Sequence, residues 1–486
     1  MVGYIILGVV GLFLAIVLIR TFTFNPKVTE IPKKDVLEGI SYSDEEVIHH
    51  LAEMIRCKTV SDRDESKIDW AEFEKFQQLL PKLYPLIHEK FTLEKIGKTG
   101  LLYHMKGKKE GAPIILMAHY DVVPIDEEQW EKPAFDGIIE DGVLWGRGTL
   151  DTKGSLCGIV EAVENLLHNG FEPTYDLYLA FSGDEEVDGL SCPEMVKTFE
   201  ERGITPRFVL DEGGAIVEGA FPGVSAACAM IGTAEKGGLC VDLEIKTPGG
   251  HSSTPPKKTA LGRLSKAVTR LEKHPMKCHM TKPVAEMLDT LGRHSSFGLK
   301  VLFANLWCFK PLFFMVCKML GGELNAMATT TLAVTKMQGS DAYNVLPPKA
   351  TAGANLRLLE GDSIEDAIAH IKKVIKDEDI EVRVVSGSNA SRTSRTDCPE
   401  FALITQTIRQ TWDGVVPSPY LMMACSDSRH YSRISDRVYR FSPMTMSSAE
   451  RKMIHGHNER VEESNIKNTV AFFMRLLLQL DQLEEL

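Results

Sequence analysis

The sequence predicts an α/β fold in which a doubly wound domain is interrupted by a smaller two-layer α+β domain. Short apolar runs alternate with helical patterns in the first part of the chain, which is typical of a parallel sheet covered by helices. These runs lie at 113–118, 176–182 and 207–211. Later runs alternate apolar with polar residues, as in an exposed antiparallel sheet; they lie at 239–247, 330–337 and 351–359. A chain of 486 residues also exceeds what one compact core usually holds.

These patterns divide the chain into five parts. A helical pattern that follows the polar residues 43–46 opens the larger domain. After residue 364 the first pattern resumes and continues to a helix at 466–482, so the smaller domain is an insertion. The predicted parts are a hydrophobic segment at 1–24, a polar tether at 25–42, the large domain at 43–235 and 361–486, and the insertion at 236–360.

The first 19 residues contain no charged side chain, and residues 4–19 are strongly apolar. A membrane-spanning helix needs about 20 such residues, with about 17 as the lower end. A cleaved signal peptide is the alternative, although the segment lacks a basic start and bulky residues follow Arg20. Basic residues after the segment favour a cytoplasmic body by the positive-inside rule. We therefore expect either a single-pass membrane anchor or a secreted or lumenal protein.

Composition argues against two classes of function. The net charge of -12, without a basic stripe, argues against a nucleic-acid partner. The ten cysteines form no CxxC pair, which argues against a zinc finger or a redox motif, and disulfide pairing cannot be read from the sequence alone. A hydrophobic segment at 297–320 is interrupted by lysines and a proline, so a second membrane span is not expected. It forms either a set of half-buried helices or an apolar surface that contacts a hydrophobic substrate or a membrane.

Acidic and histidine side chains follow the predicted parallel strands. His119 and Asp121 leave the first strand, Asp151 lies in a glycine-bounded loop, and Glu185 with Glu186 follows the second strand. Alone, each motif has an ordinary explanation, since such residues are common in turns and on solvated faces. Together they fall at the carboxyl ends of neighbouring strands, where α/β sheets bind ligands. Asp211, at the end of the third strand, belongs to the same set.

This combination of side chains suits a pair of metal ions. Zinc binds imidazole nitrogen and carboxylate oxygen, and a two-metal site needs a carboxylate that bridges the ions. A neighbouring carboxylate outside the metal shell can accept a proton from a water molecule. The sequence therefore predicts a hydrolytic metal site at this edge of the sheet.

Six motifs occur in a characteristic order. They are His119-x-Asp121, Gly-Arg-Gly-Thr-x-Asp151-x-Lys-Gly, Asp-Glu185-Glu186, Asp211-Glu-Gly-Gly, Gly-His251-Ser-Ser and His455-x-x-Asn-Glu. They resemble the co-catalytic zinc family of aminoacylase and carboxypeptidase S, over about residues 45–480. Within that family the sequence is most similar to the N-fatty-acyl-amino-acid synthase/hydrolase branch. The resemblance implies a doubly wound zinc-peptidase catalytic domain with an inserted lid or dimerisation domain.

The resemblance also implies two Zn²⁺ ions per subunit and their ligands. His119 and Asp211 would hold one zinc, Glu186 and His455 the other, and Asp151 would bridge them. His457 competes with His455, but the family places its histidine four residues before the glutamate, which favours His455. Most members have Asp-Asp at the bridging loop where this chain has Asp151-Thr152. The bridge is kept, and a role for the second carboxylate is lost.

The remaining roles implied by the family concern catalysis and substrate binding. Glu185 would act as general base and then as acid, while Asp121 would orient His119. His251 would stabilise the oxyanion, and Arg357 would grip the substrate carboxylate with Asn344 beside it.

The expected function is hydrolysis, or the reverse synthesis, of the amide bond of an N-acyl amino acid. A dipeptide carboxypeptidase with the same site is the alternative, and an inactive binding module of the same fold is a remote one. Both enzymes act on small-molecule substrates. The family also implies a homodimer through the inserted domain, in which His251 would serve the partner's zinc site.

Overall fold

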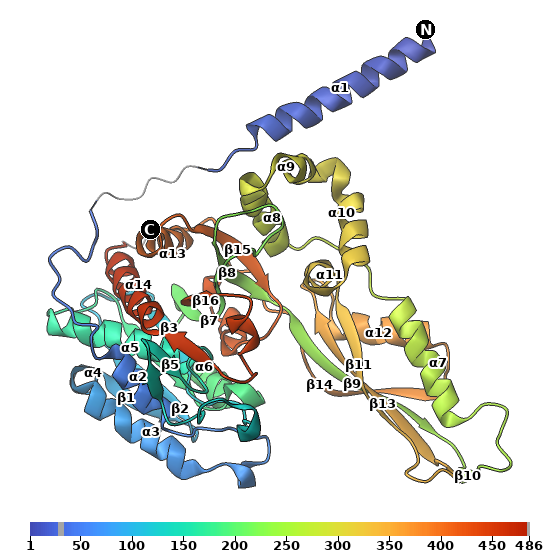
Figure 1. Ribbon diagram of the computed structural model, residues 1–486, viewed down its shortest axis with the longest axis horizontal. Coiled ribbons are helices and arrows are strands. Elements are labelled where there is room, and N and C mark those ends of the chain that lie inside the picture. The colour runs from blue at the N-terminus through green and yellow to red at the C-terminus, as the bar shows by residue number, and fades with distance from the viewer. Residues whose placement is uncertain (28–33, 484–486) are drawn as a thin grey trace.

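The computed structural model describes residues 1–27 and 34–483, and it consists of two domains and a protruding N-terminal helix (Figure 1). Residues 28–33 of the predicted tether and residues 484–486 of the predicted last part lie outside the described residues. The larger domain contains the N- and C-terminal parts of the chain, and the smaller one is inserted between them. The predicted α/β architecture with an inserted α+β domain is confirmed.

A mixed sheet forms the centre of the larger domain. In spatial order its strands are β1 (Thr92–Ile96), β2 (Gly100–Met105), β6 (Leu177–Ser182), β3 (Ile114–His119), β7 (Phe208–Val217), β16 (Val438–Met446), β8 (Cys228–Glu235) and β15 (Val416–Met422). The central strands β6, β3, β7 and β16 run parallel. β3 and β6 are buried along their whole length, as expected for continuous apolar runs between two layers of helices.

Helices cover both faces of this sheet. One face packs against α2 (Val47–Ile55), α3 (Trp70–Leu83), α4 (Pro85–Lys90), α5 (Lys153–His168), α13 (Pro399–Thr411) and α14 (Glu463–Asp481). The other face packs against α6 (Ser191–Glu201). A small sheet of β4 (Ile138–Glu140), β5 (Val143–Trp145) and β17 (Arg460–Glu462) joins the two halves of the domain. The polar residues before α2 provide no side-chain cap, because the helix begins at Val47 after an uncapped Glu46.

The inserted domain is a second sheet with two helices on one face. Its strands, in spatial order, are β11 (Thr331–Gln338), β13 (Lys349–Leu358), β9 (Gly237–Lys246) and β14 (Ile380–Ser388). Its helices are α7 (Ala260–Lys273) and α12 (Ile364–Ile375). A short two-stranded ribbon of β10 (Gly250–His251) and β12 (Val345–Leu346), which are distant in sequence, extends from its far end.

The predicted end of the insertion at residue 360 is too early. β14 pairs with β9 along most of its length, and α12 packs on the same sheet. The pattern after residue 364 therefore belongs to the small domain, because its apolar residues face the small domain's core. Doubly wound structure resumes only after residue 388, which ends β14.

Another part of the predicted insertion packs elsewhere. It comprises α8 (Lys282–His294), α9 (Phe297–Ala304), α10 (Leu306–Leu320) and α11 (Gly322–Ala328). Buried residues of these helices join the core of the larger domain, and α8 lies against β15. The hydrophobic segment 297–320 forms α9 and α10, which meet at an angle of 112° beside the N-terminal helix α1 (Val2–Thr23).

Candidate metal centre

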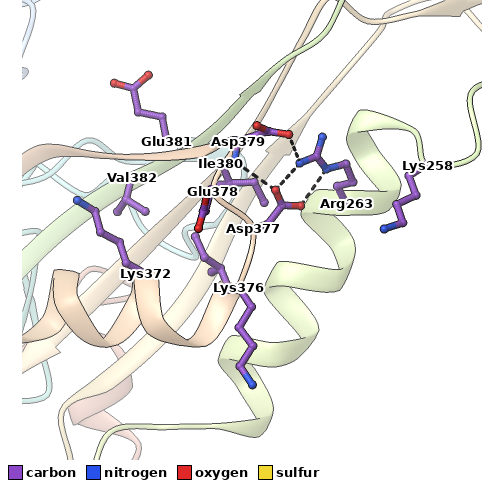
Figure 2. Close-up of a pocket in the computed structure, with 11 residues that line it drawn as sticks. Lys258, Arg263, Lys372, Lys376, Asp377, Glu378, Asp379, Ile380, Glu381 and Val382 are labelled. Carbon is purple, nitrogen blue, oxygen red and sulfur yellow. Dashed lines mark hydrogen bonds and ion pairs between the residues drawn. The ribbon is translucent and has the colours of Figure 1, made fainter.

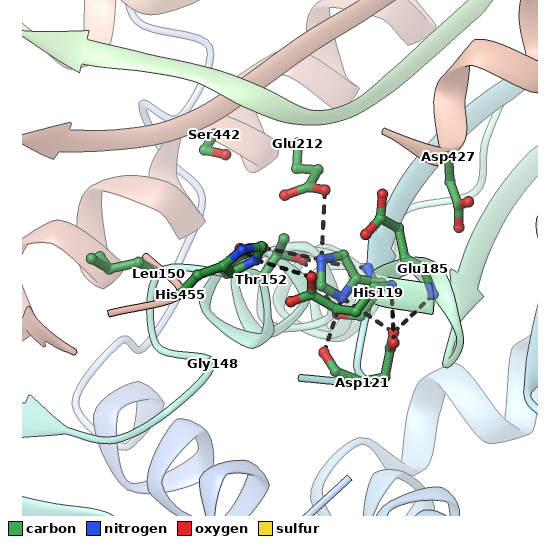
Figure 3. Close-up of polar contacts among 12 residues, drawn as sticks. His119, Asp121, Gly148, Leu150, Thr152, Glu185, Glu212, Asp427, Ser442 and His455 are labelled. Carbon is green, nitrogen blue, oxygen red and sulfur yellow. Dashed lines mark hydrogen bonds and ion pairs between the residues drawn. The ribbon is translucent and has the colours of Figure 1, made fainter. Parts of the chain in front are cut away.

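Three neighbouring parallel strands bring the predicted site residues together. His119 is the last residue of β3, Glu185 and Glu186 form the turn after β6, and Glu212 lies on β7 where pairing with β3 has ended. The side chains meet at the carboxyl edge of the sheet, as Figure 3 shows for His119, Glu185 and Glu212.

Asp151 lies between two imidazoles. Its Oδ1 is 3.1 Å from His119 Nε2, and its Oδ2 is 3.1 Å from His455 Nε2. His455 Nε2 is also 3.0 Å from Glu186 Oε2. The predicted combination of Asp151 with His119, Glu186 and His455 is thus present as a cluster, whereas no such contact is described for His457. One carboxylate shared by two histidines has the arrangement that a bridging ligand requires.

β7 presents two adjacent carboxylates to different surroundings. Glu212 Oε1 lies 3.5 Å from His119 Nε2. Asp211, which the sequence analysis assigned as the ligand, is buried and accepts the backbone N–H of Ser428 at 2.9 Å. Successive side chains of a strand point to opposite faces, so only one of the pair can face the cluster. His119, Glu185 and Glu212 offer atoms close enough together to hold an ion, as do His119, Asp151 and Glu186.

Asp121 connects His119 to the turn that carries Glu185 and Glu186. It is fully buried, and its two oxygens accept the backbone N–H groups of Glu185 and Glu186 at 3.2 and 3.1 Å. His119 Nδ1 lies 3.0 Å from the Asp121 carbonyl and 3.3 Å from its carboxylate. These contacts orient the imidazole so that Nε2 faces the cluster.

Glu459 positions the loop that bears Asp151, a role that the sequence analysis missed. Its Oε1 accepts the N–H groups of Gly148 and Leu150 at 3.1 and 2.7 Å, and its Oε2 pairs with Arg147 at 2.7 Å. Gly148 adopts φ 95°, which favours glycine. The sequence motifs could have indicated this role. A buried carboxylate requires hydrogen-bond donors, and the Gly-Arg-Gly loop supplies backbone N–H groups and an arginine.

His455 is held in an uncommon backbone conformation. Its φ of 57° lies in the left-handed region, which residues other than glycine rarely adopt. Such conformations occur where the surrounding structure imposes them, often at functional sites. Here the conformation directs the imidazole at Asp151 and Glu186.

The cluster has more carboxylates than its histidines can neutralise. Burial and the neighbouring Asp151 raise the pKa of Glu212 to about 8, and burial raises the pKa values of Glu185 and Glu186. Hydrogen bonds to Asp151 and Glu186 raise the pKa of His455 to about 10. Bringing these acids together in a shielded site is costly unless cations join them. The donor set of imidazole nitrogens and carboxylate oxygens therefore fits divalent metal ions.

Arg357 lies at the junction of the two domains. It belongs to β13, and its Nη1 lies 3.1 Å from Cys425 Sγ beyond the end of β15. Buried Lys236 lies nearby, and burial together with the Arg357 charge lowers the pKa of Lys236 to about 8. Arg357 is half-buried, and no carboxylate partner is described for it.

His251 and Asn344 are not part of this cluster. Both are exposed and lie beside each other at the two-stranded ribbon at the far end of the inserted domain, where Ser252 N–H donates to the Asn344 carbonyl at 3.0 Å. Figure 1 shows this ribbon, labelled β10, well away from β3 and β7. The structure of one chain thus leaves these two predicted residues outside their predicted site.

Two hollows differ in how they relate to the cluster. The larger lies on the inserted domain, where Arg263 pairs with Asp377 and Asp379 and Lys258 also lines the hollow (Figure 2). The smaller has a volume of about 390 Å³ and adjoins the cluster, since Gly213 and Ile454 line it. The rest of its wall is mainly apolar and includes Ala215, Met230, Met287, Leu324, Met327 and Met422.

The fold and donor set define a class, a metallopeptidase-like amidohydrolase. Residues 115–479 match the model of Peptidase family M20/M25/M40, and the chain belongs to this family. It is 35% identical to a probable carboxypeptidase S-like 2 of Dictyostelium discoideum, over 96% of this chain and 92% of that protein. It is 32% identical to the N-fatty-acyl-amino acid synthase/hydrolase PM20D1 of Xenopus tropicalis, over 96% of this chain and 93% of that protein.

Solved structures share the architecture. An M20 family metallo-carboxypeptidase from Sulfolobus solfataricus aligns with a TM-score of 0.65 at 16% identity, covering 90% of this chain and 100% of that chain. Human carnosine dipeptidase 1 aligns with a TM-score of 0.63 at 13% identity, covering 90% and 97%. The family assignment that the sequence motifs predicted is confirmed.

Proposed function

We propose that this enzyme hydrolyses the amide bond of N-acyl amino acids, and that it forms the same bond when the reaction runs in reverse. The observation that supports the proposal most is the Asp151 carboxylate shared between His119 and His455, with Glu185 beside it. Relatives named as N-fatty-acyl-amino acid synthase/hydrolases and as carboxypeptidase S-like proteins make an amino-acid amide the expected substrate.

Two zinc ions are the proposed cofactor. His119 with Glu212, and His455 with Glu186, would each hold one ion, and Asp151 would bridge them. We assign Glu212 in place of Asp211 because only the Glu212 carboxylate has a described contact with His119. Metal bound here supplies Lewis acidity that polarises a carbonyl and lowers the pKa of water.

Glu185 is the proposed proton-transfer residue. The environment raises its pKa above the ordinary value because it is shielded from water and faces other carboxylates. A carboxyl group tuned upward can take a proton from water and later return it to the departing nitrogen. Asp121 would support this step by holding the Glu185 backbone.

Arg357 is the proposed partner of the substrate carboxylate. Its guanidinium lacks a described acidic partner, and it lies at the junction of the two domains. A planar guanidinium can form two parallel hydrogen bonds to a carboxylate.

The apolar cavity is the proposed site of the acyl chain. It begins beside the residues that follow Glu212 and precede His455, and its volume of about 390 Å³ is in the range of small-molecule sites. Each buried methylene contributes about 0.8 kcal/mol, or about fourfold in affinity. Filling it through Leu324→Trp should therefore lower kcat/KM for N-oleoyl substrates more than for N-acetyl ones. Leu93→Trp, on β1 at the opposite edge of the sheet, is the matched control.

Substrate profiling tests the proposal. The purified full-length enzyme should be assayed with N-acetyl, N-oleoyl and dipeptidyl forms of one amino acid, with zinc present. We expect the highest kcat/KM for an N-acyl amino acid. Preference for the dipeptide would favour the carboxypeptidase alternative, and no turnover of any amide would favour an inactive binding module.

We also propose that the enzyme is a homodimer in which His251 and Asn344 complete the partner's site. The support is their exposed position at a two-stranded ribbon remote from the candidate metal centre of their own chain. Mixing inactive His251→Ala and Glu185→Gln chains should then restore part of the activity, since one site in the mixed dimer has both groups. No recovery after verified subunit exchange would mean that His251 does not act across a dimer.

A further inference from the structure

Helices α9 and α10 expose an apolar surface that the rest of the described chain does not cover. We call these two helices the platform. Trp307 is 56% exposed, Met315 52% and Met319 77%. Phe297, Leu312 and Leu320 add to the same kind of surface. Apolar patches of this kind mark contacts with membranes or other proteins.

The two sides of α10 differ in what they contact. Phe313 and Cys317 are buried and pack into the core of the larger domain. Leu312, Met315 and Met319 are spaced three and four residues apart, so they share one face, and all three are exposed. A helix that is apolar on both sides needs an apolar partner on each. The described part of the chain supplies only the first partner.

The platform is attached to the N-terminal helix α1. Asn305 Nδ2 donates to the Val17 carbonyl and to Thr21 Oγ1, both at 3.2 Å, and Arg20 Nε donates to the Ala304 carbonyl at 3.1 Å. These bonds are part-buried or buried, so α1 and the platform are joined by polar contacts with defined geometry.

Aromatic contacts extend this attachment along α1. The ring of Phe13 lies 6.0 Å from that of Trp307, and the ring of Phe22 lies 5.5 Å from that of Phe297. Figure 1 shows α9 beside the C-terminal end of α1, while the rest of α1 extends away from both domains. The platform therefore contacts one side of the C-terminal half of α1, where Val17 and Thr21 are buried.

The length of α1 sets the depth of the platform. Its 22 residues rise about 33 Å, enough to cross the hydrocarbon core of a bilayer. Arg20 marks the end of the apolar stretch and hence the membrane surface. Phe13 lies about 10 Å along the helix from Arg20. Trp307, which contacts Phe13, would lie at the same depth, and helices in the membrane interface sink by about 5–10 Å.

We propose that the platform is a second membrane contact, in which the exposed face of α10 lies in the bilayer interface beside the inserted α1. A lipid surface is the partner that fits this face, because the face lies beside α1, a helix that is long and apolar enough to span a bilayer. Lys310 and Lys318 are exposed on α10, and their long side chains can reach the headgroups while their methylenes stay in apolar surroundings. α11, which lines the apolar cavity, follows α10 directly, so the cavity would lie near the membrane surface.

Quenching of Trp307 by brominated lipid tests the proposal. The full-length protein is reconstituted into phosphatidylcholine vesicles with bromine either near the headgroup or near the end of the acyl chain. We expect quenching to be stronger with bromine near the headgroup, and to be largely lost in Trp307→Phe. Equal quenching of the native protein and Trp307→Phe would overturn the proposal, as would protection of Trp307 from lipid by a second copy of the chain.

Introducing charge on the exposed face of α10 distinguishes its role from that of α1. Met315→Glu with Met319→Glu should reduce the quenching of Trp307, since the charged side chains oppose burial in lipid. Val384→Glu with Val385→Glu is the matched control, because these valines are exposed on β14 of the inserted domain. Unchanged quenching in the α10 variant would mean that Trp307 meets lipid only through α1 and would overturn the role of α10. Thermal unfolding and hydrolysis of an N-acetyl substrate show that each variant is folded, independently of the membrane contact.

Discussion

Replacing Glu212 by glutamine tests which of two adjacent carboxylates binds metal. Glu212 Oε1 lies 3.5 Å from His119 Nε2, whereas Asp211 accepts the Ser428 N–H at 2.9 Å. Glutamine keeps the shape of Glu212 but lacks its charge. Loss of a residue that merely positions a ligand lowers metal affinity by about 10–100-fold. Loss of a ligand itself should reach at least the upper value, which corresponds to about 2.8 kcal/mol.

The assay is zinc titration in competition with a chromophoric chelator. Glu212→Gln should lose tight binding at one of two zinc sites and retain it at the other. Asp211→Asn, the matched control, should retain both sites and the stability of the fold, because burial already disfavours the charged carboxylate by raising its pKa and an asparagine oxygen can still accept the Ser428 N–H. The opposite pattern, with zinc lost in Asp211→Asn and kept in Glu212→Gln, would refute the assignment of Glu212.

Three further predictions concern substrate binding, the pH dependence of stability and the hydrophobic segment 297–320. Arg357→Lys should raise KM sharply because a point charge does not reproduce the planar fork, and amidation of the substrate carboxylate should then cost little more; equal losses on amidation for both enzymes would contradict the role. Hydrogen bonding to Glu161 raises the pKa of His50 above 6.5, so this half-buried pair stabilises the fold below about pH 6.5 and loses its effect as pH rises through the raised pKa. The deficit in thermal stability of His50→Gln, about 1 kcal/mol or less, should therefore shrink at alkaline pH, and a constant deficit would exclude this ion pair. Phe313→Ser should lower stability by about 3 kcal/mol or more and depress activity on short and long acyl chains alike, because Phe313 is a core residue outside the cavity wall; a selective loss of N-oleoyl activity would show instead that it contacts the acyl chain.

The sequence predicted the strands of the metal centre well because their signals are local. β3 and β6 are continuous apolar runs, and a polar residue marks the end of each. His119 and Glu186 lie at those ends, whereas Asp151 and His455 lie in loops and were assigned from the family motifs. Glu212 was missed because Asp211 and Glu212 are adjacent and equally acidic. Only the orientation of the strand decides which of them faces the cluster.

The division into domains depended on tertiary contacts that local patterns do not reveal. β14 alternates like an edge strand, but nothing in its sequence indicates that β9 is its partner. The helices α8–α11 lie inside the insertion in sequence and pack on the larger domain in space. Likewise, His251 and Asn344 lie far from the cluster of their own chain because β10 and β12, which are distant in sequence, pair at the far end of the inserted domain.

The most direct test of the hydrolytic centre is the activity and zinc content of Glu185→Gln, with Glu186→Gln as the comparison. Glu185 is proposed to transfer protons without being needed to hold either ion, whereas Glu186 lies with Asp151 and His455 in the metal cluster. We predict that Glu185→Gln retains both zinc ions and loses at least about 100-fold in the rate of N-acyl amino acid hydrolysis, the scale of general acid–base catalysis. Glu186→Gln should instead lose zinc. Hydrolysis by Glu185→Gln at the native rate, with zinc content unchanged, would contradict the account.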